Sequence, residues 1–89
     1  MQFEWSEAKR LTVLETRGLD FLDGRRLFDG RRLHTLGSRR EAEQRWLSIG
    51  ELDGRLVAIV WMLRAETIRI ITMRRARRAE ERRYRALYD

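Results

Sequence analysis

Apolar residues recur at helical spacing in two segments near the start of the chain, which predicts two short helices. Ser6 fits the N-cap of the first helix, and Gly18 stops it after Arg17. The second helix is predicted to open at Asp20. It would contain Gly24, although glycine in a helix interior costs about 1 kcal/mol relative to alanine. Two helices are therefore expected within the first third of the chain.

From Leu33 onward the apolar period changes towards two, which is typical of strands. This period predicts three strands, at Arg45–Gly50, Arg55–Leu63 and Thr67–Met73. Asp53-Gly54 is a strong hairpin signal, and Arg64-Ala65-Glu66 is short enough for a second tight turn. The run Leu56–Leu63 is apolar on both faces, so we expect it at the centre of an antiparallel meander.

The two ends of the chain complete an α+β fold. Gln2–Trp5 fits a short N-terminal edge strand, and a last helix is predicted to start near Ala76. His34 is expected in a loop. The sequence therefore predicts one domain, residues 1–89, with two N-terminal helices, a three-stranded antiparallel meander and a C-terminal helix.

Charge narrows the classes of partner. The 89 residues include 20 basic and 14 acidic side chains, Lys9 is the only lysine, and the net charge is +6. Such a balance favours RNA, DNA or another polyanion. A membrane is disfavoured, because the C-terminal helix has only an alanine stripe and Leu56–Leu63 is too short to span a bilayer. The absence of cysteine, with a single histidine, predicts no metal and no cofactor. No stretch resembles a signal peptide, so the cytoplasm is the expected compartment.

Charged side chains on the predicted meander are the strongest candidates for chemistry. These are Arg45, Arg64, Glu66, Arg69 and Arg74. Arg69 interrupts an otherwise apolar strand, so it is either exposed on an open sheet face or paired, for example with Glu43 or Glu80. It also fits the polar half of an ordinary half-buried strand, which requires no function.

Arginines crowd the end of the last strand and the C-terminal helix. They are Arg74, Arg75, Arg77, Arg78, Arg82, Arg83 and Arg85. Taken singly, each helix arginine fits a solvated surface. Together they form a positive field that attracts RNA. Trp46 and Trp61 are predicted to pack in the core rather than to stack on bases.

Four short blocks of sequence, in order, carry a family resemblance. They are Phe3-Glu4-Trp5 with Glu7 and Lys9; Gly18-Leu19-Asp20-Phe21 with Leu27-Phe28-Asp29; Glu43-Gln44-Arg45 with Ile49-Gly50; and Arg64 with Arg69-Ile70-Ile71-Thr72-Met73-Arg74, Ala76, Glu80 and Tyr84. In this order and spacing the blocks resemble the BrnT family of bacterial toxins over nearly the whole chain.

This resemblance implies a RelE-like fold and a metal-independent endoribonuclease toxin of a type II toxin–antitoxin pair, which inhibits translation by cleaving RNA. The implied partner is a BrnA-like ribbon-helix-helix antitoxin, through whose complex operator DNA is bound. Arg64, Arg69 and Arg74 would hold the scissile phosphate, and Lys9 or Glu66 would assist proton transfer. The remaining predicted contacts to RNA are Arg45, Arg75, Arg78 and Arg82.

The chain departs from the family pattern before the second helix. Thr16-Arg17-Gly18 stands where the family commonly has Lys-His-Gly, so a group able to shuttle a proton is replaced by one that stays charged. Two hypotheses remain open. One is an active endoribonuclease, and the other is a non-catalytic relative that only binds an antitoxin or nucleic acid.

Overall fold

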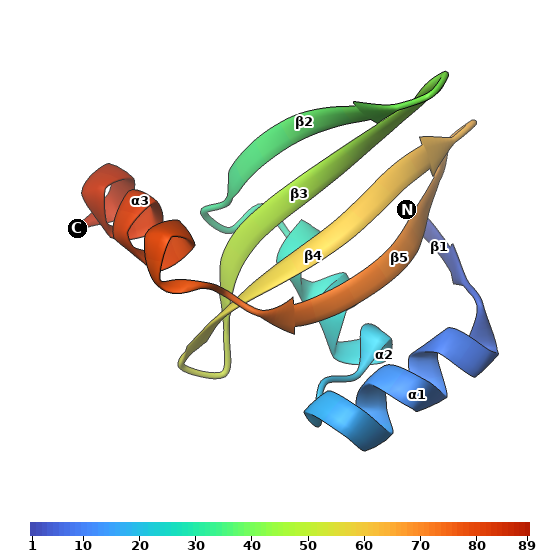
Figure 1. Cartoon of the computed structure of the whole chain (residues 1–89), viewed down its shortest axis with the longest axis horizontal. Coiled ribbons are helices and arrows are strands. Elements are labelled where there is room, and N and C mark those ends of the chain that lie inside the picture. Colours follow the sequence, from blue (N-terminus) through green and yellow to red (C-terminus); the bar gives the residue numbers. More distant parts are fainter.

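A five-stranded sheet in the order β1-β5-β4-β3-β2 forms the centre of the molecule. The computed structural model describes residues 1–89. Its elements are β1 (Gln2–Trp5), α1 (Glu7–Arg17), α2 (Phe21–Gly24), a 3-10 helix (Arg25–Phe28), β2 (His34–Arg40), β3 (Glu43–Leu52), β4 (Arg55–Arg64), β5 (Thr67–Arg75) and α3 (Arg78–Tyr88) (Figure 1). The predicted α+β class is confirmed.

The sheet holds more strands than the predicted meander. Strands β2 to β5 form a four-stranded antiparallel meander with β4 inside the sheet, so the central position predicted for Leu56–Leu63 is confirmed. The prediction missed β2 and wrongly placed His34 in a loop. The sequence of β2 is polar, and its side chains from Thr35 to Arg40 are all exposed. Its conformation comes from pairing with β3, from His34↔Ile49 to Arg40↔Glu43.

Strand β1 confirms the predicted N-terminal edge strand, and it covers only part of its neighbour. It pairs in parallel with the first residues of β5 and ends at Trp5↔Ile70. Residues 71–75 of β5 therefore have one free edge. Opposite Val60 and Trp61 the ladder is interrupted, because these residues pair with Thr72 and Ile70 and leave Ile71 without a partner. Such a bulge redirects side chains and often occurs beside a functional site.

The two tight turns of the meander occur where the sequence predicts them. Asp53 and Gly54 connect β3 to β4 with φ angles of 53° and 81°, as a two-residue turn with both residues left-handed requires. Ala65 and Glu66 connect β4 to β5.

The first helix matches its prediction, whereas the second is shorter. The Ser6 side chain accepts a hydrogen bond from the backbone N–H of Lys9, and α1 ends at Gly18. Asp20 caps α2 as predicted, by accepting from the N–H of Leu22. However, α2 is a single turn that continues as a 3-10 helix, and Gly24 is its last residue rather than an interior one.

Close packing explains the glycine at the end of α2. A Cβ atom at Gly24 would lie 2.7 Å from Sδ of Met73 and 3.2 Å from Cδ1 of Ile59, and both side chains are fully buried. The absence of a side chain therefore lets α2 approach β4 and β5.

Replacing Gly24 by alanine is expected to destabilise the protein by about 1–2 kcal/mol, because the added methyl overpacks the core. Helix propensity alone predicts the opposite sign. Urea unfolding followed by circular dichroism measures the change. Arg25→Ala, at the exposed next position, should change the free energy of unfolding by less than about 0.5 kcal/mol. A more stable Gly24→Ala protein would contradict the packing explanation.

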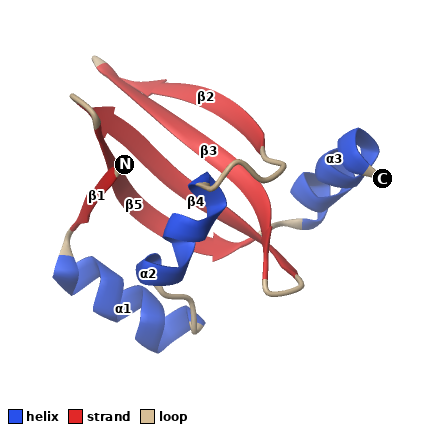
Figure 2. Ribbon diagram, turned by 180° about the vertical axis from the view of Figure 1, so that it is seen from behind, coloured by secondary structure: helices blue, strands red, loops and turns tan.

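Helices cover both faces of the sheet. On one face, α1 and α2 bury Val13 and Phe21 against Ile59, Ile70 and other strand residues; α2 lies in front of the sheet when the molecule is seen from behind (Figure 2). On the opposite face, α3 buries Tyr84 against the strands. This helix starts at Arg78, two residues later than predicted. None of the helices has the length and apolar character needed to cross a membrane.

Candidate nucleic-acid interface

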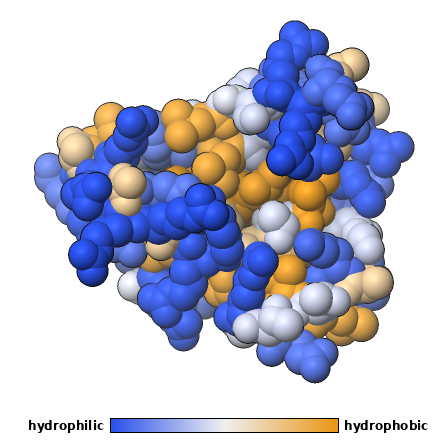
Figure 3. Space-filling model, in the orientation of Figure 1, coloured by the Kyte–Doolittle hydropathy of each residue, from blue (hydrophilic) through white to orange (hydrophobic).

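The α3 face of the sheet contains a hollow beside the first turn of α3, with a volume of about 540 Å³. It is lined by Ser38, Arg40, Arg45, Trp46, Leu47, Val60, Ile71, Thr72, Arg74 and Arg77. Four guanidinium groups thus surround a floor of apolar residues, namely Trp46, Leu47, Val60 and Ile71. The space-filling view of this side shows apolar atoms in the middle, with hydrophilic groups on either side (Figure 3). A floor of this kind accepts the flat face of a base, while the arginines accept phosphate.

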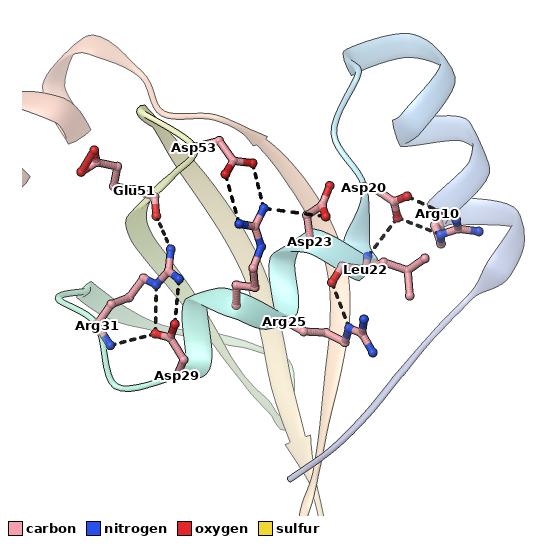
Figure 4. Close-up of polar contacts among 10 residues, drawn as sticks. Arg10, Asp20, Leu22, Asp23, Arg25, Asp29, Arg31, Glu51 and Asp53 are labelled. Atoms are coloured by element: carbon pink, nitrogen blue, oxygen red, sulfur yellow. Dashed lines mark hydrogen bonds and ion pairs between the residues drawn. The ribbon is translucent and has the colours of Figure 1, made fainter.

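A second hollow of similar volume, about 530 Å³, is less suited to a polyanion. Its lining includes Asp29, Glu51 and Asp53, against two arginines: Arg31, which is paired with Asp29, and Arg32, which contacts only Tyr88. Arg31 binds both carboxylate oxygens of Asp29 and the backbone carbonyl of Glu51 (Figure 4). Arg26, which lies outside this lining, binds Asp53 through two bonds of 2.8 and 3.1 Å. The three carboxylates would repel phosphate, so the α3 face is the better candidate.

Arg74 is the most firmly positioned arginine of the hollow. Its two terminal nitrogens bind the two carboxylate oxygens of Glu80 at 2.8 and 2.9 Å, and Nη1 also donates to the carbonyl of Arg75. Glu80 in turn accepts from the backbone N–H of Arg77 at the start of α3. The Arg74 guanidinium, followed by the Arg77 N–H, lowers the pKa of Glu80 to about 2. The pair therefore stays ionised and holds the arginine in place.

The other three arginines of the hollow are less constrained. Arg45 makes a single ion pair with Glu43 at 3.2 Å, and its buried Nε has no hydrogen-bond acceptor. Arg40 and Arg77 are exposed and lie within 4.0 Å of no carboxylate. Two full positive charges at the hollow therefore remain uncompensated, and such charges can bind an anion.

Arg64 and Arg69 lie on the same face but outside the hollow. Both reach Glu4 of β1, Arg69 through a 3.3 Å hydrogen bond and Arg64 at 4.0 Å. Arg69 is therefore paired, although with Glu4 rather than with either acid considered from the sequence. Arg69 pairs with Met62 of β4, and Arg74 pairs with Ala58, four residues away on β4. The two arginines are therefore about 13 Å apart along the strands. The three predicted arginines share one face, but they do not converge on one point.

Other predicted residues lie farther from the hollow. Lys9 is on the exposed side of α1, a helix that packs on the opposite face of the sheet. Glu66 is in the β4–β5 turn and exposed. The predicted RNA contacts Arg75, Arg78 and Arg82 are exposed and make no ion pair, and none of them lines the hollow.

Arg40, with Ser38 and Thr72, was not identified from the sequence, and Arg77 was placed only in the general positive field. The two polar residues of β2 were missed together with their strand. The pair Arg39-Arg40 directly before a turn could have indicated this strand. Charged side chains are common on edge strands, because they oppose pairing of the exposed edge with another chain. Thr72 faces the hollow because of the bulge at Ile71, and no simple alternation predicts this.

Comparison with known proteins gives one family. Residues 5–80 match the model of the BrnT family, described as the ribonuclease toxin of a type II toxin–antitoxin system. No curated protein matches the sequence.

Proposed function

Because the chain belongs to the BrnT family of ribonuclease toxins of type II toxin–antitoxin systems, we propose that it is a metal-independent endoribonuclease of the cytoplasm, which inhibits translation by cleaving RNA. The observation that supports this assignment is the hollow on the α3 face, where four arginines surround an apolar floor. Phosphate and base thus each have a matching surface within one site.

The chemistry proposed for the hollow is attack of an RNA 2′-hydroxyl oxygen on its adjacent phosphorus. A new P–O bond forms, the bond to the 5′-oxygen breaks, and a proton passes to that leaving oxygen. Negative charge builds on the non-bridging oxygens, and fixed guanidinium groups stabilise it without changing their own protonation state. Arg74 uses three of its five N–H donors within the protein, so two remain for a phosphate oxygen.

The two ends of the face are proposed to have different roles. Arg74 and Arg45 would meet the scissile phosphate at the hollow, whereas Arg64 and Arg69 would hold a neighbouring part of the strand. Glu4 already compensates part of the charge at that second point. Lys9 and Glu66 lie away from the hollow, so the proposal leaves proton transfer to solvent.

Induced expression tests this function. The protein should arrest growth, and the purified protein should cleave RNA in the presence of EDTA, leaving 2′,3′-cyclic phosphate ends. An RNA with 2′-O-methyl groups is the matched control, because it lacks the attacking oxygen. A folded protein that neither arrests growth nor cleaves RNA would favour the non-catalytic alternative, which acts only by binding a partner.

The partner that we propose is a BrnA-like ribbon-helix-helix antitoxin, through which the complex would reach operator DNA. The exposed arginines of α3 and of the hollow favour an acidic segment of that partner. The association rate should therefore fall steeply between about 50 and 500 mM salt, because long-range attraction is screened. Stopped-flow measurement with the purified partner tests this expectation. A rate that does not change with salt would exclude steering by these charges.

A further inference from the structure

Arg17 belongs to α1, yet its side chain reaches the strand that borders the hollow. Nη1 donates to the backbone carbonyl of Met73 at 2.7 Å and to the hydroxyl of Thr72 at 3.3 Å. Thr72 itself lines the hollow. Arg17 therefore contacts a residue of the hollow on the α3 face, although its helix packs on the opposite face of the sheet.

The free edge of β5 gives Arg17 this access. Strand β1 ends at Trp5↔Ile70, so residues 71–75 have β4 on one side and no strand on the other. The last turn of α1 lies near this end of β5, beyond the end of β1 (Figure 1). The bulge at Ile71 places Thr72 opposite Val60, another residue of the hollow. A side chain that passes around the open edge therefore arrives at the rim of the hollow.

The charge of Arg17 is uncompensated. Its two partners are neutral oxygens, and no carboxylate lies within 4.0 Å of it, in contrast to Arg69 and Arg74. Nε and Nη2 make no hydrogen bond within the protein, and the residue is exposed. One nitrogen therefore fixes the position of the group, and the other donors remain available to a ligand.

We propose that Arg17 is a further RNA-binding residue, which extends the cationic face around the free edge of β5 and binds a phosphate of the strand as it leaves the hollow. This inference rests on the proposed function, because it takes RNA as the ligand. It assigns Arg17 to binding and not to the bond-breaking step.

The salt dependence of RNA affinity tests the role of Arg17. A 2′-O-methyl oligonucleotide is titrated with the parent, Arg17→Ala, Arg17→Gln and Arg17→Lys at several salt concentrations. Each phosphate contact to a single strand contributes about 0.7 to the slope of log affinity against log salt. In Arg17→Ala and Arg17→Gln the magnitude of this slope should fall by about 0.7, and both variants should bind the oligonucleotide about 3- to 10-fold more weakly at low salt. Arg17→Lys should recover the slope.

The matched control is Arg25→Ala. Arg25 is also exposed, also donates to a backbone carbonyl and also makes no ion pair, but it does not lie at the hollow. Its removal should leave the slope unchanged. In cleavage assays, Arg17→Ala should raise KM while leaving kcat within about twofold of the parent.

The possible results separate this inference from the proposed function. If the parent binds RNA and both Arg17→Ala and Arg17→Gln keep its slope, Arg17 contacts no phosphate and the function stands without it. An equal loss of slope in Arg25→Ala would also reject a specific contact at Arg17. A parent that binds no RNA would overturn the proposed function together with this inference.

Discussion

Replacing Arg74 by alanine is expected to slow RNA cleavage by on the order of 10²–10³, which is the usual effect of removing one fixed donor from a preorganised site. Arg74 lines the hollow, and Glu80 holds its guanidinium through two hydrogen bonds. Arg74→Lys keeps the charge but loses the planar fork, so it should restore only part of the rate. Single-turnover cleavage of RNA in EDTA measures the effect, with circular dichroism to establish folding.

Arg82→Ala is the matched control for this loss. Arg82 also belongs to the basic C-terminal region, but it is two helical positions from the buried Tyr84, so it points away from the sheet. Its removal should leave the rate of single-turnover cleavage at saturating protein within about threefold of the parent. Arg69→Ala should mainly weaken RNA binding, because Arg69 lies outside the hollow. A folded Arg74→Ala protein with the parental rate would exclude Arg74 from the reaction.

The second large effect concerns stability at low pH. The folded-state pKa of Glu80 is about 2, below its ordinary value of 4.5, mainly because Arg74 donates to the carboxylate. A lowered pKa means that ionised Glu80 stabilises the folded state above about pH 4.5, and that this contribution is lost as the pH falls towards 2. For a partly screened pair it amounts to about 1–2 kcal/mol. Asp29, held by Arg31, also has a pKa of about 2 and acts with the same sign.

Glu80→Gln isolates the contribution of this one carboxylate. At pH 7 the variant should be about 1–2 kcal/mol less stable than the parent, and the difference should shrink between pH 5 and pH 2. Urea unfolding at a series of pH values provides the comparison. Glu15→Gln, at an exposed carboxylate of α1 that makes no ion pair, should match the parent at every pH. A constant difference between Glu80→Gln and the parent would contradict the assigned linkage.

Local sequence signals identified most of the elements, because each signal acts within a few residues. The cap residues Ser6 and Asp20 satisfy backbone N–H groups of their own helices, so their effect is readable without tertiary contacts. Asp53-Gly54 sets its turn by the same kind of local constraint. The apolar run of β4 identified the strand that is covered on both faces. These signals gave the α+β class and the central strand.

The edge strand β2 could not be predicted from such local signals. Strand β2 has almost no apolar face, and pairing with β3 gives it the conformation that its own residues do not favour. The length of α2 likewise depends on Gly24 meeting Met73, a contact between residues far apart in the chain.

The sequence by itself determined that the protein is strongly basic, that arginine supplies nearly all of its positive charge, and that its family is BrnT. Only the tertiary structure decided which arginines share a site. The bulge at Ile71 and the early end of β1 bring Thr72 and Arg17 together, and Glu80 fixes Arg74 beside Arg77. Such groupings depend on strand register and on a free edge, which are properties of the assembled sheet and of no single segment.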